Sequence, residues 1–186
     1  AKTTKLVTQW NISAINYDDD SSAFEGSYME GWLNDTSVDG FLGNLRDPEK
    51  FIKMDSKWNA SQMSDTSKPP SESEGGTIVE DPVGLLNLYE YSSTTSNNSY
   101  LNNELSWWTL TPYNANVVHK NVYTGSIDSS TNTSSLNGIR PSINLKPTVK
   151  VVDGNGTSDD PYRLLGDNDT NLDGAKLNTR YSGEYI

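Results

Sequence analysis

The segment Leu105-Ser-Trp-Trp-Thr-Leu-Thr-Pro-Tyr113 is the densest aromatic patch of the chain. Adjacent residues of a β-strand point to opposite faces of the sheet. We therefore expect one of Trp107 and Trp108 to enter the core and the other to face a groove or solvent. Two interpretations stay open: both indoles stabilise the fold, which we favour, or one of them forms an aromatic platform for a sugar ring.

Further strands are expected on both sides of this segment. Residues 2–17 alternate apolar and polar side chains, which is typical of a half-buried strand. Asn137-Gly138 is a strong signal for a type I′ hairpin turn. The remaining expected strands cover residues 116–122, 124–127, 139–152, 161–165 and 179–186, and the first two of these are expected to pair as a hairpin.

Helices are expected to be few and short. Residues 27–34 read as a helix in which Ser27 caps the N-terminus and Glu30 occupies the reciprocal capping-box position. Residues 83–91 look like a strand that passes into a helical turn. Residues 59–77 are rich in Ser, Pro, Gly and Glu, which predicts a long exposed loop. The sequence thus predicts one domain over residues 1–186, with a β-rich α+β fold, one or two short helices and long irregular loops.

Composition limits the classes of partner. The chain has 186 residues and a formal net charge of −11, and such an acidic surface repels nucleic acid and anionic membranes. No apolar run approaches the ~18 residues of a transmembrane helix, so we expect no direct membrane insertion. The chain has no cysteine, which fits a cytosolic protein and equally the exterior of a Gram-positive cell. Ala1 in place of an initiating Met indicates a processed or excised piece.

Three sequence blocks carry a resemblance to a known family. They are Ser27-Tyr28…Trp32-Leu33-Asn34 with Phe41-Leu42, then Trp107-Trp108-Thr109-Leu110-Thr111-Pro112, then Gly138-Ile139-Arg140-Pro141-Ser142-Ile143-Asn144-Leu145-Lys146 leading to Gly154…Pro161-Tyr162. In this order they resemble a domain of unknown function of Gram-positive secreted and surface proteins, including pilus-like ones. The resemblance covers about residues 25–165.

The resemblance implies a fold and a location. That family is similar to the C-type-lectin-like and sulfatase-modifying-factor-like fold, so a C-type-lectin-like mixed sheet and a secreted, extracellular location are expected. No catalytic residue is carried over from the family. The last residues, Arg180-Tyr-Ser-Gly-Glu-Tyr-Ile186, resemble the start of a following module. Residues 175–186 are therefore expected to lead into a following repeat.

Arg140 lies directly before Pro141 in an extended segment. An arginine in such a strand can be buried beside a carboxylate, and Glu30 of the helical segment is one candidate partner. We favour an ion pair that helps to define the fold. The alternative is that Arg140 binds a ligand.

Two acidic stretches have the oxygen-rich alternation of calcium loops. In the first, Asp167, Asp169, Asn171 and Asp173 match the early ligand spacing, but Leu172 stands where an EF-hand needs glycine and Asn178 where it needs glutamate. Calcium is therefore a candidate cofactor, and a solvated acidic turn is the favoured alternative. The second stretch repeats the alternation with weaker ligands at Asp153, Asn155, Thr157, Asp159 and Asp160.

Catalytic groups are scarce, and we expect no enzyme. His119 is the only histidine, and it stands in an alternating strand as an exposed residue. A zinc centre or a Ser-His-Asp triad would have only this imidazole to use. With 25 acidic residues some carboxylate pair always falls at a suitable distance, so a glycosidase pair has no specific signal.

The expected function is that of a non-catalytic structural or adhesive domain in a surface protein or filament that self-assembles. Its expected partners are copies of itself or neighbouring repeats, and host or cell-surface glycans or proteins. The alternatives are calcium-assisted, lectin-like binding of a glycan or protein and, least favoured, a carbohydrate-active enzyme.

Overall fold

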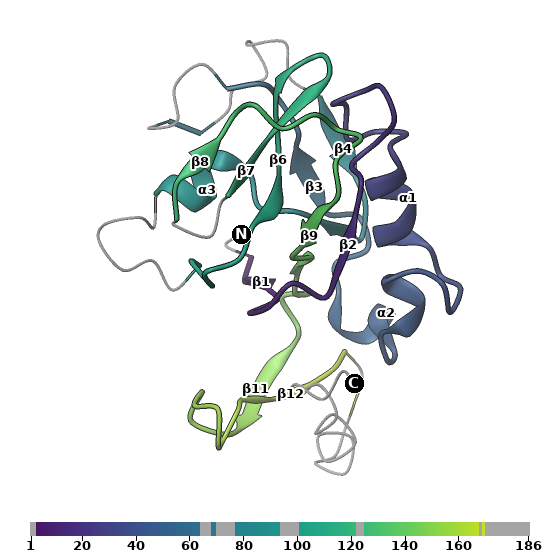
Figure 1. The fold of residues 1–186 in the computed structure, drawn as a ribbon. Helices are drawn as coiled ribbons and strands as arrows, with labels where there is room; N and C mark the ends of the chain where they lie inside the picture. The colour runs from purple at the N-terminus through teal and green to yellow at the C-terminus, as the bar shows by residue number, and fades with distance from the viewer. Residues whose placement is uncertain are drawn as a thin grey trace.

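The chain is described here by a computed structural model covering residues 3–63, 68–69, 77–93, 101–121, 125–167 and 169. Four small sheets and three short α-helices make up this part of the chain (Figure 1). The fold is therefore a mostly-β α+β fold, as the sequence predicts. None of the helices in the described ranges has the length and apolar character needed to cross a membrane.

The largest sheet is mixed and has the strand order β2-β9-β6-β7-β8. Its strands are β2 (Ser13–Ile15), β9 (Asn137–Ile139), β6 (Trp107–Asn114), β7 (Val117–Asn121) and β8 (Ile127–Asp128). The only parallel contact in it joins β6 to β9 at Trp107 and Gly138, and the other neighbours are antiparallel. The predicted pairing of 116–122 with 124–127 is confirmed, because β7 and β8 pair.

The predicted turn at Asn137-Gly138 is wrong, because both residues lie inside strand β9. Close packing, rather than a turn, requires glycine at position 138. A Cβ atom there would lie 1.8 Å from Nδ2 of Asn11 and 2.6 Å from the carbonyl oxygen of Ser106. The glycine therefore allows the close approach of three chain segments beside β6, which a side chain would prevent.

The second sheet has the order β1-β10-β5 and contains β1 (Lys5–Val7), β10 (Ser142–Asn144) and β5 (Val83–Gly84). The single strand predicted over residues 2–17 is thus two strands, β1 and β2, in different sheets. Val7 pairs with Ser142 and Ser13 pairs with Ile139. Between these pairs, residues 8–12 form a bulge opposite Arg140 and Pro141. Proline ends a ladder because it has no N–H to donate, so both antiparallel partners change sheets at the same place.

Ser27 caps α1 (Tyr28–Asn34) as the sequence predicts, but the Glu30 carboxylate bonds to Gly26 N–H and not to the Ser27 N–H that a capping box requires. In α1, Ser27 Oγ accepts a hydrogen bond from the Glu30 N–H at 3.1 Å, while the Glu30 carboxylate accepts from Gly26 N–H at 2.5 Å. Helix α3 (Leu88–Ser92) follows β5 and has a full capping box between Asn87 and Glu90. The remaining helices are α2 (Pro48–Phe51) and the 3₁₀ turn η1 (Leu42–Asn44).

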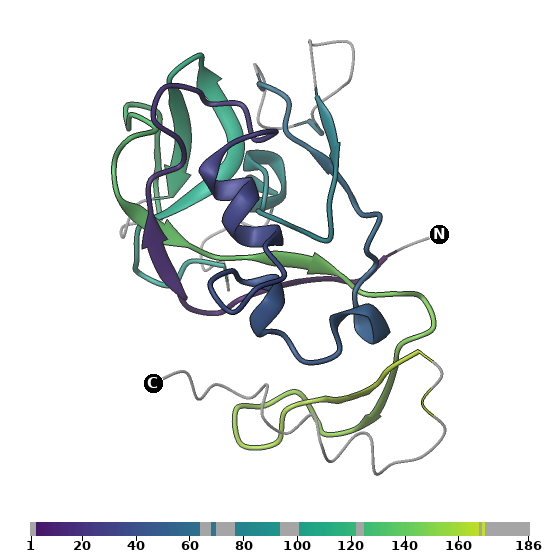
Figure 2. The same cartoon turned by 90° about the vertical axis from the view of Figure 1, so that its right-hand side faces the viewer.

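Two hairpins complete the described structure. Strands β3 (Lys57–Asn59) and β4 (Ile78–Glu80) pair at one side of the body, and the segment after β3 begins with three buried residues, Ala60, Ser61 and Met63. The exposed loop predicted over residues 59–77 is therefore buried at its start. Strands β11 (Lys150–Asp153) and β12 (Arg163–Leu165) form a hairpin that projects beyond α2, away from the larger sheets (Figures 1 and 2).

Candidate functional site

Trp108 lies in the main hydrophobic core. It is fully buried, its ring makes an edge contact with Tyr17 at a centroid distance of 5.8 Å, and its indole N–H donates to the carbonyl oxygen of Ile15 at 3.0 Å. The same core contains Met29 and Leu33 of helix α1. A side chain so enclosed stabilises the fold and offers no face to a ligand.

Trp107 points to the other face of β6 and lies in a second, smaller core. Its ring meets Tyr91 of helix α3 edge-on at 5.4 Å, and Leu86 and Leu101 complete the cluster. Trp107 is 1% exposed. The expectation that one indole faces a groove or solvent is wrong, because β6 is covered by apolar side chains on both faces. The aromatic platform for a sugar ring is absent at this place.

Arg140 is buried against this second core without a carboxylate. Its Nε donates to the carbonyl oxygen of Thr8 at 2.8 Å, its Nη1 donates to the carbonyl oxygen of Leu101, and the guanidinium lies 4.9 Å from the ring centre of Trp107. Only 2% of the residue is exposed. The predicted ion pair with Glu30 is wrong, because Glu30 caps helix α1 and no described carboxylate pairs with Arg140. Backbone carbonyls and an indole face hold the cation instead.

Burial affects the charge of this arginine only moderately. Desolvation lowers the pKa of the Arg140 guanidinium from 12.5 to about 10, and Tyr91 opposes the change. At neutral pH the side chain is therefore still cationic. Burial of a charge that lacks a counter-ion is costly, so a nearby anion would be strongly favoured.

A cavity of about 630 Å³ opens beside Arg140. The side chains of Lys5 and Glu90 form an ion pair in its wall, and the Lys5 ammonium also lies 4.6 Å from the ring centre of Trp58. Glu90 in addition accepts the N–H of Asn87 at 3.0 Å. Sequence reasoning missed Lys5 and Glu90, and no signal connects them, because they lie 85 residues apart in the chain.

A second, apolar cavity of about 290 Å³ lies between the body of the domain and the β11–β12 hairpin. Its walls are mainly aliphatic and aromatic side chains from β1, α2, β10 and β12 and from the residues that flank η1. They include Leu6, Phe41, Phe51, Ile143, Tyr162 and Leu164. Arg46 and Arg163 add the only two charged side chains of this lining. The cavity therefore suits an apolar occupant.

The candidate calcium stretch is described only at its first two carboxylates. Asp167 pairs with Lys146 at 3.3 Å, and Asp169 pairs with Lys50 at 3.2 Å. Asn171 and Asp173 lie outside the described residues, as does the strand predicted over 179–186. In the part of the chain that the structure describes, no group of three His, Cys, Asp or Glu side chains could hold a metal ion. The described carboxylates of this stretch thus bind lysines.

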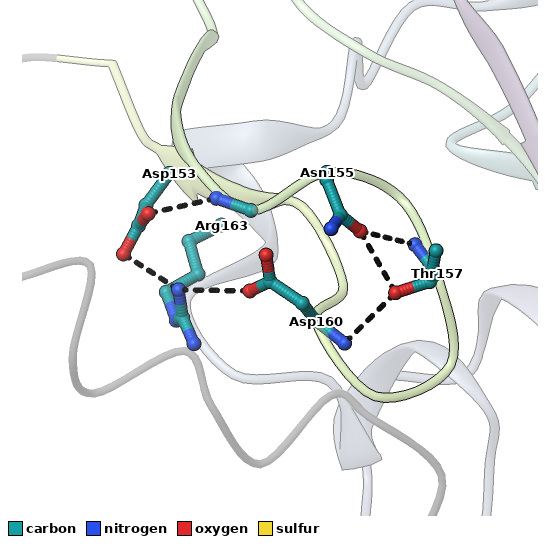
Figure 3. Close-up of polar contacts among 6 residues, drawn as sticks. Asp153, Asn155, Thr157, Asp160 and Arg163 are labelled. Atoms are coloured by element: carbon teal, nitrogen blue, oxygen red, sulfur yellow. Dashed lines mark hydrogen bonds and ion pairs between the residues drawn. The ribbon is translucent and has the colours of Figure 1, made fainter.

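The weaker acidic stretch forms the loop between β11 and β12. Its side-chain oxygens interact with groups of the same loop and with Arg163 (Figure 3). Asn155 Oδ1 accepts from both the N–H and the hydroxyl of Thr157, at 3.1 and 2.8 Å, and Asp153 pairs with Arg163 at 2.6 Å. Gly154 has a φ of +87°, and a Cβ there would lie 2.1 Å from the carbonyl oxygen of Pro161. Turn geometry explains the alternation of this loop.

A carboxylate cluster lies on the other side of the molecule, between helix α1 and the β4–β5 connection. Asp81 is hydrogen-bonded to Glu30, and Glu25 is close enough to repel it. Desolvation first, then the hydrogen bond and the repulsion, raise the pKa of Asp81 to about 7. Neither of the two cavities is lined by these residues.

His119 belongs to strand β7, as predicted, but its side chain lies outside the described part of the structure. No proposal is therefore placed on this residue.

Comparison with known proteins identifies a family for most of the chain. Residues 2–147 match the family described as a domain of unknown function, DUF6273, and this range includes every described element from β1 to β10. The match ends before the β11–β12 hairpin. No curated protein and no solved structure matches the chain. Because the match covers well over half of its length, the chain belongs to the DUF6273 family.

Proposed function

We propose that this chain is a non-catalytic, extracellular binding domain that associates with copies of itself or with neighbouring repeats. The observation that carries the proposal is the β11–β12 hairpin beside the apolar cavity. In the described structure the two strands pair only with each other. Among the described strands β11 has no neighbour other than β12, so its outer edge offers N–H and C=O groups as a template for a strand from another chain.

The side chains of the hairpin support this role. Val151 and Tyr162 are each 58% exposed, and Leu164 lines the apolar cavity. A strand added to the hairpin edge could place an apolar side chain into the cavity and cover Val151. The proposal places the chain in a C-type-lectin-like surface or filament protein of a Gram-positive cell, and the motif blocks described above are its support.

The alternatives have weaker support. Calcium-assisted lectin-like binding would need free oxygen ligands, and the two described carboxylates of that stretch are paired with lysines. A carbohydrate-active enzyme would need two carboxylates that face a cleft. We therefore favour assembly over both.

Light scattering across a concentration series tests the proposal. The native chain should associate as its concentration rises, and Val151→Lys should weaken that association because a charged edge residue disfavours strand addition. Val38→Lys is the matched control, since Val38 is also exposed, at 81%, but lies in the loop after α1. A native chain that stays monomeric at high concentration, or association weakened equally by both substitutions, would contradict the proposal.

A further inference from the structure

The guanidinium of Arg140 has unused hydrogen-bonding capacity. An arginine side chain has five N–H donors. The structure gives two of them a protein partner, through Nε to Thr8 and Nη1 to Leu101. The second N–H of Nη1 and both N–H groups of Nη2 have no hydrogen-bond partner among the described residues. Three donors of a buried cation thus remain for a ligand.

These donors belong to a residue that lines the 630 Å³ cavity. Cavities of this size fall within the range of roughly 300–1,000 Å³ that small-molecule sites occupy. The other charges of the wall do not satisfy Arg140, because Lys5 and Glu90 pair with each other. The described residues of the cavity wall therefore carry one net positive charge, in a chain whose net charge is −11.

The remainder of the wall is largely apolar. Val7, Leu86 and Leu101 contribute aliphatic surface, and the exposed side chain of Gln9 has no hydrogen-bond partner among the described residues. One free cation suits a single negative charge, and the fixed fork of an arginine fits the two oxygens of a carboxylate. A phosphate or sulfate would bring a second charge beside Glu90, and the described lining has no second unpaired cation to meet it.

We propose that the cavity beside Arg140 binds an amphipathic monocarboxylate, whose carboxylate lies on the guanidinium and whose apolar body packs on Val7, Leu86 and Leu101. Gln9 supplies a further hydrogen bond at the cavity mouth. The site is separate from the hairpin and its apolar cavity, so it does not depend on assembly.

Hexanoate is a suitable probe, with hexanamide as its neutral match and inorganic phosphate as the polyvalent anion. Titration followed by calorimetry and by the Arg140 Nε–H resonance should show saturable, one-to-one binding of hexanoate at millimolar concentration. Hexanamide and phosphate should bind more weakly. Loss of a charge-assisted hydrogen bond corresponds to about tenfold, so Arg140→Gln should lower hexanoate affinity by about tenfold or more.

Two further variants keep the test decisive where Arg140→Gln fails to fold. Glu90→Gln removes the nearby negative charge and keeps a capping side chain, so hexanoate should bind more tightly. Arg163→Gln, which changes an arginine of the hairpin, should leave the affinity unchanged. No hexanoate binding, equal binding of hexanamide, preferred binding of phosphate, or unchanged or weaker hexanoate binding in Glu90→Gln would each overturn the proposal.

Discussion

Arg140 and Asp81 are both ionisable groups that the fold encloses without a counter-ion, yet their surroundings differ. Arg140 lies on the Trp107 side of strand β6 and is held by two backbone carbonyls and an indole face. Asp81 lies beside helix α1, where Glu30 and Glu25 face it and no described basic side chain pairs with it. Arg140 is therefore a cation held by uncharged groups, whereas Asp81 is a carboxyl group next to two other carboxyl groups.

The difference shows how each group avoids the cost of a buried charge. A carboxyl can take up a proton, and the pKa of Asp81, raised to about 7, indicates that it does so near neutral pH. A guanidinium cannot lose its proton in this range, because burial lowers its pKa only to about 10. Arg140 must therefore be satisfied by hydrogen bonds and a ligand, while Asp81 makes the stability of the fold depend on pH.

The largest expected effect comes from removing the buried cation. Arg140→Gln leaves the carbonyl oxygens of Thr8 and Leu101 without their charged donor. Each such bond is worth about 1.5–3 kcal/mol, so we expect the free energy of unfolding to fall by about 3 kcal/mol or more. Urea denaturation measures the change. A loss below about 1 kcal/mol would mean that Arg140 does not hold β1 and residue 101 together.

The next effect concerns the indole that covers the cation. Trp107→Leu keeps an apolar side chain in the second core but removes the ring face beneath Arg140. We expect a loss of about 2 kcal/mol, which combines a partly filled cavity with a lost cation–π contact. The double variant with Arg140→Gln should lose less than the sum of the two single variants, since they share this contact. Strict additivity in urea denaturation would argue against the coupling.

The raised pKa of Asp81 predicts that the stability of the fold depends on pH. Because the pKa of Asp81 is raised in the folded protein, the folded state binds more protons than the unfolded state between about pH 4 and 7. The contribution of this group to stability is therefore full below pH 4 and is lost as the pH rises through 7. Asp81→Asn should raise the melting temperature at pH 8 and reduce its fall between pH 5 and 8. A scan of melting temperature against pH for both proteins checks this, and parallel curves would refute it.

The smallest effect is expected where an arginine has ordinary solvated partners. Arg163 pairs with Asp153 at 2.6 Å and lies 3.6 Å from Asp160, whose side chain is 43% exposed (Figure 3). Arg163→Gln should change the free energy of unfolding by less than about 1 kcal/mol, and salt should reduce the change further. A loss comparable with that of Arg140→Gln would remove the contrast between the two arginines.

Local signals in the sequence predicted much of the fold. The helix over 27–34, the passage from strand to helix over 83–91 and the β7–β8 pair follow from capping residues and period-two alternation. Helical spacing puts Tyr28 on the same face as Met29 and Leu33, yet only Met29 and Leu33 of α1 are buried and Tyr28 is 51% exposed. Local periodicity thus predicts where the helices and strands lie more accurately than which of their faces is buried.

The long-range contacts were not predictable in the same way. Trp107 and Trp108 alone do not show whether β6 is covered on one face or on both. The side chains that cover its second face come from distant residues such as Tyr91. Asn137-Gly138 has the composition of a turn, but the approach of Asn11 and Ser106 gives Gly138 its role. The partners of Arg140 are backbone carbonyls, which every residue has, so no residue type could reveal them.

The pairing of β1 with β10 and of β2 with β9 also affects how the protein must fold. Val7 meets Ser142 and Ser13 meets Ile139, so each contact closes a loop of more than 120 residues. Loop closure of this length must precede the favourable energy of pairing, which slows folding in chains of high contact order. During synthesis, β2 has no partner until β9 (Asn137–Ile139) has left the ribosome, and β1 has none until β10 (Ser142–Asn144) has. These two N-terminal strands therefore stay without their sheet neighbours until most of the segment from β1 to β10 has been made.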